Sequence, residues 1–100
     1  MKTNYTNATL LTEINKQIEV LGQATKINIE IWETDRNILK LIIMISNGYP
    51  IKFNNAKTIS VAELNTEEES ARILQKEGQR IKQYVKRHYP NIKVTSELYI

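Results

Sequence analysis

The sequence predicts an α+β domain: a two-layer sandwich in the order α-β-β-β-α-β, with two helices on one face of a mostly antiparallel sheet. Three observations predict it. The chain has 100 residues, which is the length of one domain. Two segments with a helical period enclose three segments with a strand period. No repeat or linker interrupts this order, so we expect a single domain over 1–100, with residues 1–6 as a loosely packed N-terminus.

The first helix is predicted from about residue 8 to 21, because apolar residues recur there at steps of three and four. Asn7 or Thr9 is expected to cap its start, and Gly22 stands where a left-handed residue ends a helix. The apolar positions are Leu10, Leu11, Ile14, Ile18 and Leu21.

Two strands follow. From Ile27 to Trp32 apolar and polar residues alternate, which predicts a strand with isoleucines on its buried face and Asn28, Glu30 and Trp32 on the other. The run from Ile38 to Ile45 is apolar on both faces and favours a central strand.

A third strand is expected to begin at Ile51 and Phe53, after the Asn47-Gly48 turn and Pro50. Asn54-Asn55 interrupt or bulge it before it resumes at Ile59 and Val61.

A second, longer helix is predicted from Thr66, which forms a capping box with Glu69, while Pro90 ends the helix. A last strand runs from Ile92 to Ile100. The expected buried stripe of the helix, in which Gly78 allows close packing against the sheet, is Ala71, Leu74, Gly78, Ile81, Val85 and His88.

The composition excludes several classes of enzyme. The chain has no cysteine, one Asp and one His, so a catalytic triad, a Cys–His pair and a two-His metal site cannot be assembled within one chain. The three glycines are too far apart for a phosphate-binding loop. We therefore expect no enzyme activity, no cofactor and no metal. The N-terminus has neither a signal peptide nor a membrane anchor, which favours the cytoplasm and no membrane partner.

Basic residues follow one another along the second helix and form a candidate phosphate-binding surface. A charged face and a basic C-terminal half are also ordinary features of an amphipathic helix, so both interpretations stay open. The candidate residues are Arg72, Lys76, Arg80, Lys82, Lys86 and Arg87.

The sheet face without helices is the candidate protein interface. Trp32 shares strand parity there with Asn28 and Glu30, and Ile42 and Met44 of the neighbouring strand have the same parity. An exposed apolar and aromatic patch of this kind binds a partner protein or a second copy of the chain.

The order of elements is similar to that of double-stranded RNA-binding domains, but Glu67, Glu68 and Glu69 stand where those domains carry lysines. It is also similar to bacterial secretion chaperones, which are usually acidic, whereas this chain has a net charge of +3. Neither family is assigned.

The sequence favours a non-catalytic binding protein, such as a phage- or plasmid-encoded inhibitor or regulator that occupies a surface of a nucleic-acid-processing protein or complex. Small size and a richness in Ile, Asn and Lys permit this interpretation. A direct nucleic-acid-binding regulator that uses the basic helix face is the first alternative. A small metal-free ribonuclease toxin built around His88 is the second.

Overall fold

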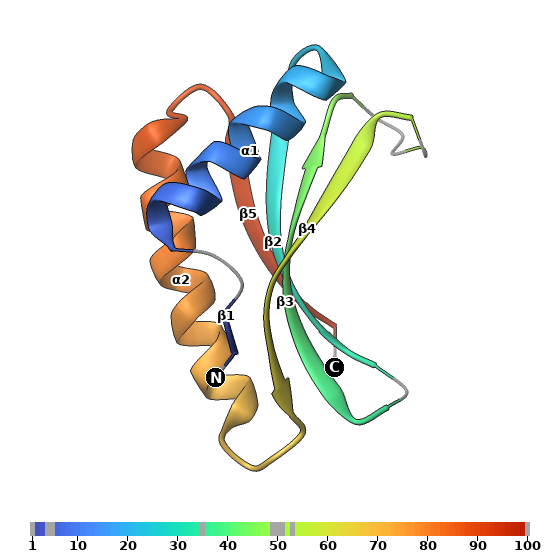
Figure 1. Cartoon of the computed structure of the whole chain (residues 1–100), viewed down its shortest axis with the longest axis vertical. Coiled ribbons are helices and arrows are strands. Elements are labelled where there is room, and N and C mark those ends of the chain that lie inside the picture. Colours follow the sequence, from blue (N-terminus) through green and yellow to red (C-terminus); the bar gives the residue numbers. More distant parts are fainter. Residues whose placement is uncertain (1, 4–5, 35, 49–51, 53, 100) are drawn as a thin grey trace.

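A computed structural model describes residues 2–3, 6–34, 36–48, 52 and 54–99 (Figure 1). It confirms the predicted α+β fold and the order α-β-β-β-α-β, and it adds a two-residue strand before the first helix. The elements are β1 (Lys2–Thr3), α1 (Asn7–Leu21), β2 (Lys26–Glu33), β3 (Ile38–Ser46), β4 (Ala56–Asn65), α2 (Ser70–His88) and β5 (Lys93–Tyr99).

The five strands form one sheet in the order β1-β4-β3-β2-β5. Neighbouring strands are antiparallel except for β2 and β5, which are parallel. The parallel pair arises because α2 carries the chain back over the sheet before β5 begins. As a result β5 lies at the edge of the sheet, beside the first long strand instead of the last.

Both helices cover the same face of the sheet (Figure 1). The side chains between the two layers form the core, and alternate residues of β2 and β3 supply much of it, with Leu74, Ile81 and Val85 from α2. We call the opposite side of the sheet the open face, because no layer of the described residues covers it. No helix in the described part of the chain is long and apolar enough to span a bilayer.

The first helix begins one residue earlier than expected and has a different cap. Thr6 is its N-cap, and Thr6 and Thr9 form a reciprocal capping box. The expected caps Asn7 and Thr9 therefore both lie inside the helix. Gly22 ends it as predicted, with a positive φ of 84°.

The predicted capping box of the second helix is wrong. The helix begins at Ser70, and Glu69, its N-cap, makes no side-chain capping bond. The N–H and hydroxyl of Thr66 instead donate to the carbonyl of Asn37, at 3.1 and 3.2 Å. A contact between distant loops thus replaces the local contact that the sequence favoured.

The rest of the α2 stripe is nearly as predicted, since Leu74, Gly78, Ile81 and Val85 are buried. The prediction that His88 belongs to the buried stripe is wrong, because His88 is exposed and its ring lies against Tyr84. The half-buried ring of Tyr89, one residue later, packs on the core instead.

The predicted start of the third strand at residues 51 and 53 lies outside the described residues. Asn54 and Asn55 form a turn, and β4 begins at Ala56. The irregularity of this strand lies further along, where the pairing with β3 shifts between Leu41 and Ile42 and both Val61 and Ala62 are buried.

Candidate binding surface on the open face of the sheet

The five residues predicted for a protein interface share the open face. Asn28 lies opposite Met44 and Glu30 opposite Ile42 in the pairing of β2 with β3, and Trp32 is next along β2. Ile42 and Met44 are half-buried, and Trp32 is 40% exposed. The strand parity predicted from the sequence therefore brings these residues together.

Strand β5 adds three residues that sequence reasoning missed. Thr95, Glu97 and Tyr99 lie opposite Asn28, Glu30 and Trp32 in the parallel pairing of β5 with β2. The sequence indicated which face of the sheet these three residues occupy, because they alternate with Ile92, Val94, Ser96 and Leu98. Nothing in the sequence indicated that β5 pairs with β2.

A polar network joins the two strands. One amide group, Asn28 Nδ2, donates to Glu30 at 2.6 Å and to Glu97 at 3.1 Å. The hydroxyl of Thr95 donates to Asn28 Oδ1 at 2.6 Å. Asn28 thus uses both ends of its amide to link β2 to β5, which stabilises the edge strand.

Two aromatic rings stack at the end of this network. Trp32 and Tyr99 have ring centroids 4.2 Å apart and planes inclined by 17°. The Trp32 indole N–H donates to Glu30 at 2.7 Å, and the Tyr99 hydroxyl donates to Glu97. Each ring therefore has one carboxylate that holds its polar atom, which limits its rotation and fixes the stack in place.

The hydrogen bond to Glu97 also changes the acidity of Tyr99. It is the largest cause that raises the pKa of Tyr99 to about 12, and the nearby carboxylates of Glu30 and Glu97 add to it. A phenolate would lose the hydrogen bond and face two negative charges. Tyr99 therefore stays protonated, and keeps its hydrogen bond to Glu97, through the whole neutral range.

A hollow of about 290 Å³ lies over this network. Its wall combines the members of the polar network other than Thr95 with the aromatic pair and the Met44 side chain, and Lys26 and Ser46 close it toward the start of β2. Such a mixture of apolar surface and a few fixed polar groups is typical of a recognition site.

Like charges face each other across β2 and β5. Glu30 lies opposite Glu97, and Lys26 lies opposite Lys93. Glu30 is only 3% exposed, and the ion pairs found in the described part of the chain do not include it. The open face therefore carries two rows of like charge across β2 and β5, one of lysines and one of glutamates, and neither row contains a countercharge. Like charges in directly opposed positions destabilise a sheet.

The basic residues predicted on α2 divide into two groups. Arg72 forms an ion pair with Glu69 at 2.5 Å, and Arg80 is paired with Glu77 and also donates to Asn7 at 2.5 Å. The hydrogen bond to Glu77 raises the pKa of Arg80. The other four make no ion pair within the described residues; they are Lys76, Lys82, Lys86 and Arg87.

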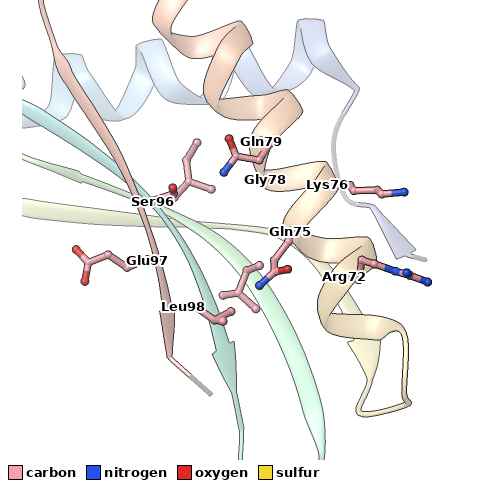
Figure 2. A pocket seen from close by; sticks show the side chains of 10 residues that line it. Arg72, Gln75, Lys76, Gly78, Gln79, Ser96, Glu97 and Leu98 are labelled. Carbon is pink, nitrogen blue, oxygen red and sulfur yellow. The ribbon is translucent and has the colours of Figure 1, made fainter.

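A second, larger hollow of about 500 Å³ lies on the helix side, between α2 and β5 (Figure 2). Its floor is apolar, with Ile29, Ile31 and the half-exposed Leu98. Figure 2 shows that Glu97 points away from α2, toward the open face. The hollow thus borders the edge strand on the side opposite the aromatic pair.

Among the described residues there is no group of three or more His, Asp or Glu side chains placed to hold a metal ion. His88 is exposed at the end of α2, where its ring lies against that of Tyr84. Comparisons with protein-family models, curated protein sequences and solved structures find no match to this chain.

Proposed function

We propose that this chain is a non-catalytic binding protein that occupies a surface of a larger protein or nucleoprotein complex through the open face. In this proposal it inhibits or regulates nucleic-acid-processing machinery, as a phage- or plasmid-encoded accessory protein would. The single observation that carries the binding role is the stacked Trp32–Tyr99 pair, half-exposed at the edge of the open face.

The ordered aromatic pair favours this surface over the others. Protein interfaces draw most of their affinity from a few aromatic side chains, and the cost of binding falls when those side chains are already ordered. Trp32 and Tyr99 are ordered by their stacking and by one hydrogen bond each to a carboxylate. Ile42 and Met44 lie on the same face, opposite Glu30 and Asn28, as half-buried apolar surface that a partner would cover.

The test is capture of partners by the immobilised protein from a bacterial lysate divided into nuclease-treated and untreated halves. Met44→Lys places a charge in the middle of the open face, and Val20→Lys places the same charge on an exposed apolar position of α1. We expect the wild type and Val20→Lys to retain the same proteins after nuclease treatment, and Met44→Lys to lose them. Equal capture by all three variants would refute the open face as the binding surface.

A direct nucleic-acid-binding role is the second candidate. The observation that favours it is the pair of exposed basic residues in the last turn of α2, Lys86 and Arg87, which make no ion pair within the described residues. Here the captured material would disappear with nuclease, and a mobility shift of nucleic acid at low salt would weaken as salt is added. Substitution of Lys86 and Arg87 by Glu would abolish the shift, whereas Met44→Lys would leave it unchanged.

A further inference from the structure

The outer edge of β5 is a free strand edge. In the described sheet β5 has β2 as its sole neighbour, and its seven residues pair with β2 without a bulge. The strand contains no proline. A long, regular edge exposes unpaired N–H and C=O groups, and proteins commonly cover or distort such edges because they pair with other strands.

The charges on β5 and β2 indicate what pairs with this edge. Within one copy, Lys26 lies beside Lys93 and Glu30 lies beside Glu97, so each row across the two strands has a single sign. A strand added to the outer edge lowers the free energy most if it presents Glu opposite Lys93 and Lys opposite Glu97. Strand β5 itself has this pattern when its direction is reversed.

We propose that two copies of this chain form a dimer through antiparallel pairing of their β5 strands, centred on Thr95. Lys93 of each copy then lies opposite Glu97 of the other, and Thr95 lies opposite itself. Each row across the joined sheet reads Lys26, Lys93, then Glu97 and Glu30 of the second copy. Both uncompensated rows are thereby neutralised at once, and one sheet of ten strands results.

Other registers lack this complementarity. Pairing about Glu97 sets two glutamates against each other, and pairing about Ser96 sets Glu97 against Thr95 of the second copy. A register that sets odd-numbered residues of one β5 strand opposite even-numbered residues of the other would turn the two open faces to opposite sides of the joined sheet. It would also separate the charged rows. Charge therefore selects both the direction and the register of the contact.

The dimer also accounts for exposed apolar surface at this edge. Leu98 is 49% exposed on the helix side of β5, where it forms part of the apolar floor of the larger hollow (Figure 2). In the proposed register, Leu98 lies next to the segment that precedes β5 in the second copy. The two aromatic pairs stay uncovered on one continuous open face, so this dimer is compatible with the proposed binding function and does not depend on it.

The experiment measures mass in solution by light scattering or sedimentation over a range of protein concentrations. We expect the wild type to approach twice 11.6 kDa as concentration rises, and the dimer to weaken with salt. Lys93→Glu and Glu97→Lys each turn two attractive pairs into repulsive ones, so each weakens dimerisation by about tenfold or more. The double variant Lys93→Glu/Glu97→Lys restores the attraction and the dimer.

Two controls separate this contact from other effects. Lys16→Glu makes the same change of charge on the exposed side of α1 and leaves the dimer intact. Lys93→Glu also removes the repulsion from Lys26 within one copy, so it does not lower the thermal stability of the monomer. Loss of dimer in this variant is therefore not a folding defect.

Three results would overturn the proposal. The wild type could remain a monomer at every concentration, or the double variant could fail to recover the dimer. A dimer that Met44→Lys dissolves and Lys93→Glu preserves would place the contact on the open face instead of the β5 edge.

Discussion

Replacing Gly78 by Ala is predicted to stabilise the protein. Gly78 lies in the middle of α2 and is buried against the sheet. A Cβ atom built at this position would lie 3.5 Å from Ile29 Cγ2 and 3.5 Å from Leu41 Cδ1, which is ordinary van der Waals contact. The close packing expected from the sequence therefore leaves room for one methyl group.

The magnitude follows from two terms. Alanine is favoured over glycine by about 1 kcal/mol in a helix interior, and burying one methyl group adds up to about 0.8 kcal/mol. We expect the free energy of unfolding to rise by about 1.5 kcal/mol, which corresponds to a midpoint of thermal unfolding about 6–12 °C higher for a domain of this size. Chemical and thermal unfolding followed by circular dichroism measure both quantities.

Gly22→Ala is the matched control. It makes the same chemical change in a residue that ends α1 with a φ of 84° and has open space around it. Because alanine is strained in that conformation, this variant is expected to lose about 1 kcal/mol. If Gly78→Ala unfolded at a lower denaturant concentration than the wild type, the reasoning about space between α2 and the sheet would be refuted.

Three further predictions concern the open face and the core. Glu30→Ala leaves the indole N–H of Trp32 without its acceptor and costs about 1–3 kcal/mol; an unchanged emission spectrum of Trp32, the single tryptophan, would contradict the hydrogen bond. Tyr99 titrates near pH 12 because of its bond to Glu97, so the stability from this bond is complete below about pH 10 and is lost as pH rises through about 12. The difference in phenolate absorbance between wild type and Tyr99→Phe measures that titration, and Glu97→Gln should move it toward 10; no movement would exclude Glu97 as the cause. Ile43→Ala removes a fully buried side chain at the centre of the sheet and is expected to cost about 2–5 kcal/mol in urea unfolding; a loss below 1 kcal/mol would argue against this core.

The sequence alone determined the elements whose patterns are periodic. The two-residue period of β2 assigned its isoleucines to the core and Asn28, Glu30 and Trp32 to the other face, and the structure agrees. The stripe on α2 was nearly correct for the same reason, since burial of a continuous face is the main force that aligns a helix on a sheet. These features depend on residues close together in the chain.

Contacts between distant residues decided the remainder. The predicted capping box at Thr66 failed because Asn37, far away in sequence, supplies the acceptor that Thr66 uses. The glutamate and tryptophan expected on the open face form, in the structure, an ordered network in which Glu30 is buried. The members of this network that the sequence did not predict belong to β5.

The position of β5 in the sheet cannot be predicted from the sequence and is set by the tertiary structure. An amphipathic strand of this composition fits beside β4 or beside β2 equally well by its own pattern, because side-chain alternation specifies a face and not a neighbour. The path of α2 across the sheet brings β5 to β2, in parallel orientation. That single pairing assembles the aromatic stack, the carboxylate pair and the charged rows, none of which is visible in either strand alone.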